Sequence, residues 1–185
     1  MSLPDDLRPS VEEFVAWEAD QEASYEYVHG DIVLMSGASE THELISGLLF
    51  STVLTSVLGT RRRCRVFKSD RMLRIGQVVR KPDVMVCCGP AAHRLHEDDA
   101  DAVAEVLSPT TKSIDLADKL AEYGQLRSIK EYLVIDPEAR RAMLYQRHEL
   151  GWLLLDDPRA DGVTFAGVRI DLDEIFDYVE RTRTT

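Results

Sequence analysis

The chain has 185 residues, of which 44% are hydrophobic, a length and composition that suit one domain over residues 1–185 with a single core. The net charge of −11 disfavours nucleic acid as a partner, and the acidic first residues argue against a secretory signal peptide. The three cysteines, Cys64, Cys87 and Cys88, contain no CxxC pair, so we expect no disulfide framework, no thiolate zinc site and a reducing cytoplasmic location.

The first half of the chain predicts two helices and several strands. Ser10 is a candidate N-cap for a helix over 10–20, and the pattern of 25–35 predicts a β-hairpin. A long helix opened by Ser39 or Thr41 follows and runs to Leu58. Its apolar stretch, from about Leu44 to Leu58, is interrupted by glycine, serine and threonine and is too short and too polar to span a bilayer. Residues 64–75 alternate in polarity, which predicts β structure.

The second half continues the alternation of strands and helices. The expected elements are strands at 81–88 and 102–107, a helix at 113–127, a strand at 131–135, a hairpin at 142–155 and a last helix opened by Asp171 or Asp173. This order predicts a mixed α/β fold in which helices pack on a central sheet.

Two carboxylates interrupt apolar strand patterns. Asp83 begins the run Pro82–Val86, and Glu105 lies inside Ala102–Leu107. Burial of an unpaired carboxylate is costly, so a cation or a basic side chain is expected beside each. If the two strands pair, both acids can converge at one end of the sheet, where their oxygen atoms would suit Mg²⁺. Two alternatives stay open: Asp83 caps backbone amides, or Glu105 pairs with an arginine.

Lys119 is a candidate partner for these acids. On the expected helix, Leu120 and Tyr123 lie near Leu116 and define its buried face. At about 100° per residue Lys119 lies about 60° from Leu116, at the margin of this face, whereas Glu122 points further toward water. The alternative is a pair between Lys119 and an acid one turn away on the same helix.

Other polar residues carry weaker signals. Glu26 is a further candidate ligand, or an acid supporting the ligands, although a surface hairpin glutamate explains it almost as well. His42 lies in the first turn of the long helix, where an ordinary cap competes with a substrate contact. The spacing of His93 and His96 allows zinc, but their acidic loop lacks a helical pattern, so we expect both histidines to be solvated.

The net charge disfavours nucleic acid as a partner, but one segment of the chain is strongly basic. Residues 61–81 hold nine basic residues against one acid, a local charge of +8 on a remainder of −19. Such a stripe can contact a phosphate backbone, and equally it can be a solvated edge strand guarded by charge. The candidate substrate-binding residues, together with His42, are Arg61, Arg63, Arg65 and Lys68.

A series of short segments resembles the putative restriction endonuclease family, formerly a domain of unknown function, in the PD-(D/E)XK nuclease superfamily. The match extends from about Tyr25 to Tyr145 in the order of the family. Its specificity comes from the whole series, which is Tyr25–Val33, His42, Pro82–Val86, Glu105–Thr110, Asp115 with Lys119 and Tyr123, and Glu131–Pro137.

The resemblance implies a restriction-endonuclease-like α/β core and a divalent metal, usually Mg²⁺, with Mn²⁺ as a substitute. By match, Asp83 and Glu105 would be metal ligands and Glu26 would complete the acidic cluster. The superfamily lysine normally follows the second acid by two residues, where this chain has Leu107, so Lys119 would supply that charge from the neighbouring helix. Relatives of this kind form homodimers, which we expect here too.

The hypothesis drawn from the sequence is hydrolysis of a nucleic-acid phosphodiester, with DNA as the expected substrate. Asp83, Glu105 and the Val106 carbonyl would hold the metal, and Lys119 would orient the attacking water or steady the transition state. Two alternatives stay open. One is a nuclease-fold protein without turnover that binds or assembles, and the other is a metal-free structural protein whose acids are ion-paired.

Overall fold

A computed structural model describes residues 8–35, 37–91, 93–108, 114–156 and 162–182, without the side chains of residues 114, 115 and 156. The helices of this part of the chain are α1 (Val11–Glu18), α2 (Glu40–Leu58), α3 (Ile114–Gln125) and α4 (Leu172–Thr182). Ser10 caps α1, because its hydroxyl accepts from the amide of Glu13, and Ser39 caps α2 in the same way.

The larger sheet has six strands in the order β11-β10-β9-β8-β6-β3. Only β8 and β9 run parallel among its neighbours, so the sheet is mixed. Its strands are β3 (Arg65–Lys68), β6 (Val84–Cys87), β8 (Ala102–Val106), β9 (Glu131–Asp136), β10 (Arg141–His148) and β11 (Gly151–Asp156).

The smaller sheet has five strands in the order β2-β1-β5-β4-β7. They are β1 (Tyr25–Val28), β2 (Asp31–Leu34), β4 (Met72–Ile75), β5 (Val78–Arg80) and β7 (His96–Glu97), and a separate hairpin joins β12 (Val163–Phe165) to β13 (Val168–Ile170). Apolar residues of α1, including Phe14, pack on Tyr27 and Val79 of this sheet.

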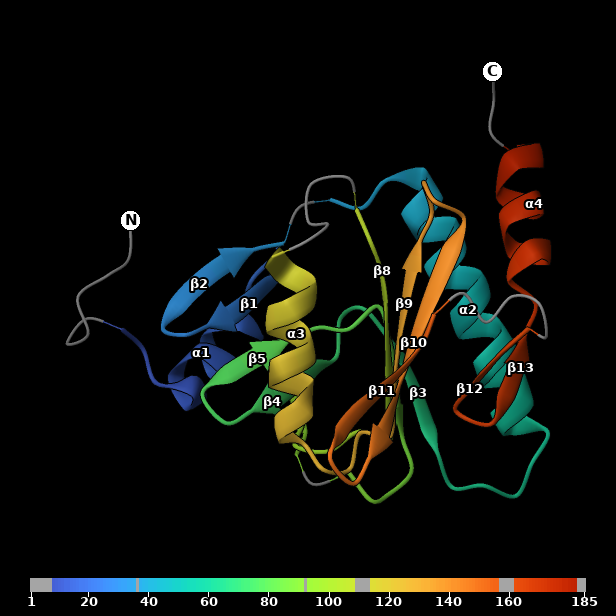
Figure 1. Cartoon of the computed structure of the whole chain (residues 1–185). Coiled ribbons are helices and arrows are strands. Elements are labelled where there is room, and N and C mark those ends of the chain that lie inside the picture. Colours follow the sequence, from blue (N-terminus) through green and yellow to red (C-terminus); the bar gives the residue numbers. More distant parts are fainter. Residues whose placement is uncertain (1–7, 36, 92, 109–113, 157–161, 183–185) are drawn as a thin grey trace.

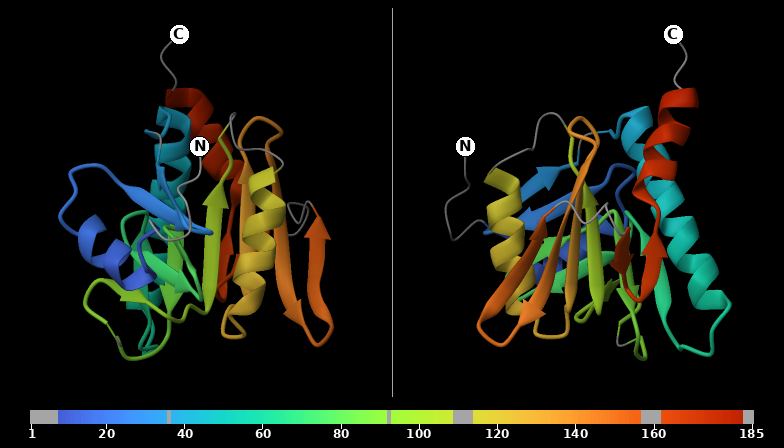
Figure 2. Two further views of the ribbon diagram at one scale, coloured as in Figure 1. Left: turned by 90° about the vertical axis from the view of Figure 1, so that its left-hand side faces the viewer. Right: turned by 45° about the vertical axis from the view of Figure 1, so that its right-hand side comes forward.

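Both faces of the larger sheet are covered (Figures 1 and 2). Helices α2 and α4 and the β12–β13 hairpin lie on one face, and α3 with the smaller sheet lies on the other. Side chains of β6 alternate between these layers, since Val84 and Val86 join the first core and Met85 and Cys87 join the second. A strand buried on both faces explains the continuous apolar run around it.

The mixed α/β architecture predicted from the sequence is confirmed, and so are the hairpin at 25–35 and the strands that carry the two acids. Strands β5, β7, β12 and β13 were not predicted, because runs of two or three residues give too little periodicity to detect. Residue 113, the expected start of the third helix, lies outside the described residues.

The apolar stretch from about Leu44 to Leu58 was expected to be too short and too polar for a bilayer, and this does not hold for the whole helix that contains it. By length and composition alone α2 could cross a membrane, although a single such helix is weak support. One side of α2 belongs to the core beside the larger sheet, with Ile45, Leu49, Val53 and Val57 buried. The apolar composition of α2 therefore serves at least the packing of this layer.

The expectation of no disulfide is also wrong, because Cys64 and Cys88 are joined. Strands β3 and β6 pair antiparallel with Arg65 opposite Cys87, so the same register brings Cys64 opposite Cys88. Adjacent residues on a strand point to opposite faces, which leaves Cys87 as a buried free thiol. The disulfide forms because two distant strands pair in this register, which the number and spacing of the cysteines do not predict.

Candidate nuclease site

A cleft of about 390 Å³ opens between the two sheets and the first turn of α2. Asp83, Glu105 and Lys119 all line it, together with Glu26 and His42. The strand register explains how the two acids meet. Val84 lies opposite Ala104 in the β6–β8 pair, so continuing this register places Asp83 opposite Glu105 on the face that carries α3.

Asp83 is 6% exposed and holds a defined orientation. Its Oδ2 atom accepts a hydrogen bond from the backbone amide of Val106 at 2.8 Å and lies 3.0 Å from Nε2 of His42. The hydrogen bond with Asp83 raises the pKa of His42 against the opposing effect of burial, which favours a charged pair. Strand β8 and helix α2 therefore fix this carboxylate.

Glu105 is held by α3. Its Oε1 atom accepts a hydrogen bond from the hydroxyl of Tyr123 at 2.7 Å and lies 3.1 Å from Nζ of Lys119. Burial raises the pKa of Glu105 to about 7, and the nearby charge of Asp83 adds to this rise, while Lys119 opposes it. The lysine side chain is 12% exposed and reaches the sheet from the margin of the buried face, as the helical rotation suggested.

Glu26 lies at the cleft but is already engaged by protein donors. Its Oε2 atom accepts from Arg80 at 2.9 Å, and its Oε1 atom accepts from the backbone amide of Lys81 at 2.9 Å. Arg80 also binds both carboxylate oxygens of Glu122. The side chain of Lys81 donates to Glu18 and, at 2.7 Å, to Ser24. A buried ionic network thus forms one wall of the cleft.

The predicted orientation of Glu122 toward water is wrong, since this residue is 3% exposed. The prediction assumed that α3 has one buried face. In the structure α3 packs against the larger sheet and is also covered by β5 of the smaller sheet, where Arg80 binds Glu122. The contacts of Arg80 and Lys81 with Glu26, and of Tyr123 with Glu105, were likewise not predicted from the sequence. A basic pair directly before Pro82 and Asp83 was the one available signal.

The basic segment 61–81 does not form a continuous stripe beside the cleft. Arg61 and Arg63 are exposed and follow the C-terminal end of α2, whose 19 residues span about 28 Å, whereas its N-terminal turn lines the cleft. Arg65 binds Glu97, and Lys68 pairs with Glu43, a residue that does line the cleft. Most of the local charge is therefore compensated within the protein.

Comparison with known proteins identifies a protein family whose model matches most of this chain. The family model Uma2, described as putative restriction endonuclease, matches residues 11–169. Two uncharacterized proteins of Synechocystis sp. are similar: slr1290 is 31% identical over 157 residues, covering 82% of each chain. The second, sll1609, is 28% identical over 151 residues, covering 78% of this chain and 84% of the relative.

A solved structure is also similar in fold. It is the crystal structure of a putative nuclease of the DUF820 group from Anabaena variabilis, with a TM-score of 0.75 and 19% identity. The similarity covers 92% of this chain and 99% of the other. At this identity the comparison establishes only that the two proteins share this α/β arrangement of helices and sheets.

Proposed function

Because the chain belongs to the Uma2 family of putative restriction endonucleases, we propose that it is a metal-dependent nuclease that hydrolyses phosphodiester bonds of DNA. The observation that carries the proposal is the state of the two acids. Each has one oxygen that accepts a hydrogen bond from the protein, and within the described residues no hydrogen bond reaches Asp83 Oδ1 or Glu105 Oε2.

The donor set fits a hard divalent cation. Two carboxylates, one directly before β6 and one on the neighbouring strand β8, match the preference of Mg²⁺ for a few oxygen ligands while it keeps several waters. We propose Asp83 and Glu105 as ligands, the Val106 carbonyl as a third, and Mn²⁺ as a substitute ion. When bound, the ion would lower the pKa of a water ligand and neutralise charge on the phosphate.

The surrounding side chains would orient the acids and the substrate. The Val106 amide and the Tyr123 hydroxyl hold the two carboxylates in fixed rotamers, which reduces the reorganisation needed at the reaction. Lys119 is placed to orient the attacking water or to stabilise the charge that develops on the phosphate. His42 contacts Asp83 through Nε2 and its Nδ1 atom is buried, so we propose that it orients this ligand instead of contacting the phosphate, and that Glu26 acts through Arg80 and Lys81 as a support of the cleft.

Plasmid cleavage tests this proposal directly. The wild-type protein should degrade DNA in Mg²⁺ or Mn²⁺ and not in EDTA. The shape-conserving variants Asp83→Asn, Glu105→Gln and Lys119→Met should lose this activity while keeping the fold. Glu12→Gln, at an exposed ion pair away from the cleft, serves as the matched control and should keep it. Equal degradation by all variants would identify a contaminating nuclease and remove support for the proposal.

The second candidate is a nuclease-fold module that binds a metal or a partner without turnover. Its support is the charge distribution, because the net charge is −11 and much of the basic segment pairs with acids of the same chain. Calorimetric titration with Mg²⁺ and Mn²⁺ separates the candidates when combined with the cleavage assay. Binding without cleavage favours the module, and no binding favours a structural role in which Lys119 satisfies Glu105 permanently.

We also propose a homodimer, for which two sheet edges offer support. Strand β2 exposes Ile32, Val33 and Leu34, and β11 exposes Leu153, Leu154 and Leu155, and both strands are at edges. Light scattering during gel filtration measures the assembly. A cytoplasmic location stays a prediction, against which the Cys64–Cys88 disulfide weighs because such bonds persist mainly in oxidising compartments.

A further inference from the structure

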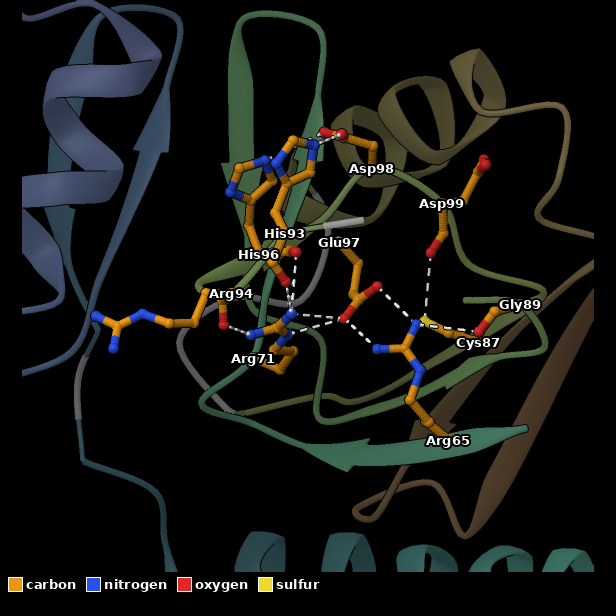
Figure 3. A network of polar contacts seen from close by, with 10 residues as sticks. All are labelled: Arg65, Arg71, Cys87, Gly89, His93, Arg94, His96, Glu97, Asp98 and Asp99. Carbon is orange, nitrogen blue, oxygen red and sulfur yellow. Dashed lines mark hydrogen bonds and ion pairs between the residues drawn. The ribbon is translucent and has the colours of Figure 1, made fainter. Parts of the chain in front are cut away.

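Three side chains that the proposed nuclease reaction does not use meet in the loop that leads into and out of β7 (Figure 3). The ligating atoms of His93, His96 and Asp98 all lie within 4.8 Å of one another. His93 Nε2 is 2.7 Å from Asp98 Oδ2, and His96 Nε2 is 3.3 Å from Asp98 Oδ1. None of the three lines the nuclease cleft.

The buried ring nitrogens of His96 are a second, independent observation that favours a ligand at this cluster. Its side chain is 12% exposed, and both ring nitrogens are buried without a hydrogen bond in the described part of the chain. Buried polar atoms are nearly always satisfied, so two on one ring require an explanation.

The backbone of the loop is fixed independently of the three side chains. The guanidinium of Arg71 donates to the carbonyls of His93, Arg94 and His96 and to the carboxylate of Glu97 (Figure 3). Glu97 is held from its other side by Arg65. The loop is thereby preorganised, and only side-chain rotation is needed to converge the three ligating atoms on one point.

We propose that His93, His96 and Asp98 form a binding site for Zn²⁺ that is separate from the nuclease cleft. Two imidazole nitrogens and one carboxylate suit zinc, whereas Mg²⁺ prefers oxygen ligands alone. Zinc bonds of about 2.0–2.2 Å in tetrahedral geometry place ligating atoms about 3.3–3.6 Å apart. The ligating atoms, one from each residue, now lie within 4.8 Å of one another, and the two histidines contact different oxygens of Asp98, so the side chains would have to move closer around one of these oxygens.

The bound ion would satisfy the buried His96 ring and tie both sides of β7 together. Three protein ligands leave the fourth position for water or for a group from a partner. A pocket of about 310 Å³ lies beside the two histidines and is also lined by Val11 and Val15 of α1, so the site adjoins an apolar surface.

The test is calorimetric titration of the full-length protein with Zn²⁺, with Co²⁺ absorption as a spectroscopic measure of coordination geometry. The background is the Asp83→Asn/Glu105→Gln double variant, in which the nuclease cleft cannot compete for metal. We expect one zinc per chain and a tetrahedral Co²⁺ spectrum. His93→Ala and Asp98→Asn should each weaken zinc binding by about 100-fold or more. Losing a group that only supports a metal ligand costs about 10–100-fold in affinity, so changing a ligand itself should cost at least the upper value.

His148→Ala is the matched control, because His148 is an exposed histidine at the end of β10, away from the cluster. It should bind zinc like its parent. His93 is 47% exposed, so its replacement is expected to leave the fold intact, which circular dichroism verifies. The proposal is overturned if the parent double variant binds no zinc, or if His93→Ala and His148→Ala bind it equally well.

Discussion

The buried ionic network beside the cleft makes a strong prediction for stability. Arg80 is 5% exposed and neutralises Glu26 and Glu122, which are 7% and 3% exposed. Arg80→Met keeps most of the side-chain volume but leaves two buried carboxylates without this cation. Removing one partner of a buried ion pair costs about 3–5 kcal/mol. For a protein of this size this corresponds to a loss of roughly 6–20 °C in Tm.

Arg74→Met is the matched control, on the strand that pairs with that of Arg80. Arg74 binds Glu12 at 2.9 Å, but the two side chains are 30% and 66% exposed, and exposed pairs contribute about 0–1 kcal/mol. Urea denaturation followed by circular dichroism gives the free energy of unfolding of both variants at pH 7.5 in EDTA. Losses that agree within about 1 kcal/mol would refute the argument that burial decides the cost.

Three further predictions concern single groups. Tyr123→Phe should weaken Mg²⁺ binding by about 10–100-fold in calorimetry, because the Tyr123 hydroxyl orients Glu105. Tyr27→Phe is the control and should leave Mg²⁺ affinity unchanged, because its hydroxyl binds the Pro9 carbonyl instead. Equal affinities of the two variants would contradict this prediction. Burial raises the pKa of Glu105 to about 7, above its unfolded value, so this carboxyl favours the folded state at low pH. In EDTA the wild-type free energy of unfolding should therefore fall relative to that of Glu105→Gln between about pH 4.5 and 7, and parallel pH curves would count against it. Burial raises the pKa of the Cys87 thiol to about 12, so native protein should resist iodoacetamide at pH 8, and rapid labelling measured by mass spectrometry would disprove it.

Some features of the candidate site could be read from local sequence. Alternation along each strand predicted that Asp83 shares a face with Met85 and Glu105 with Val103; Met85 and Val103 pack in the core beside α3, and Glu105 contacts Tyr123 and Lys119 of α3. Helical rotation likewise brought Lys119 to the edge of its helix face, within reach of the sheet. These inferences hold because they depend only on the repeat of one element.

Other features depend on which elements become neighbours. Glu122 was expected in water, and the approach of β5 with Arg80 buries it instead. The basic residues between 61 and 81 were read as one stripe, but they belong to different strands and bind different acids. A run of like charges in sequence carries no information about the partners that folding supplies.

The sequence by itself therefore determined the α/β class, the N-cap of the first helix and the family to which the chain belongs. Only the tertiary structure decided that β6 and β8 pair in the register that sets Asp83 opposite Glu105, and that Cys64 meets Cys88. Dihedral preferences and side-chain periodicity are local and can be read residue by residue. Strand register and burial of charge are set by contacts between distant segments, whose energies depend on the whole packed core.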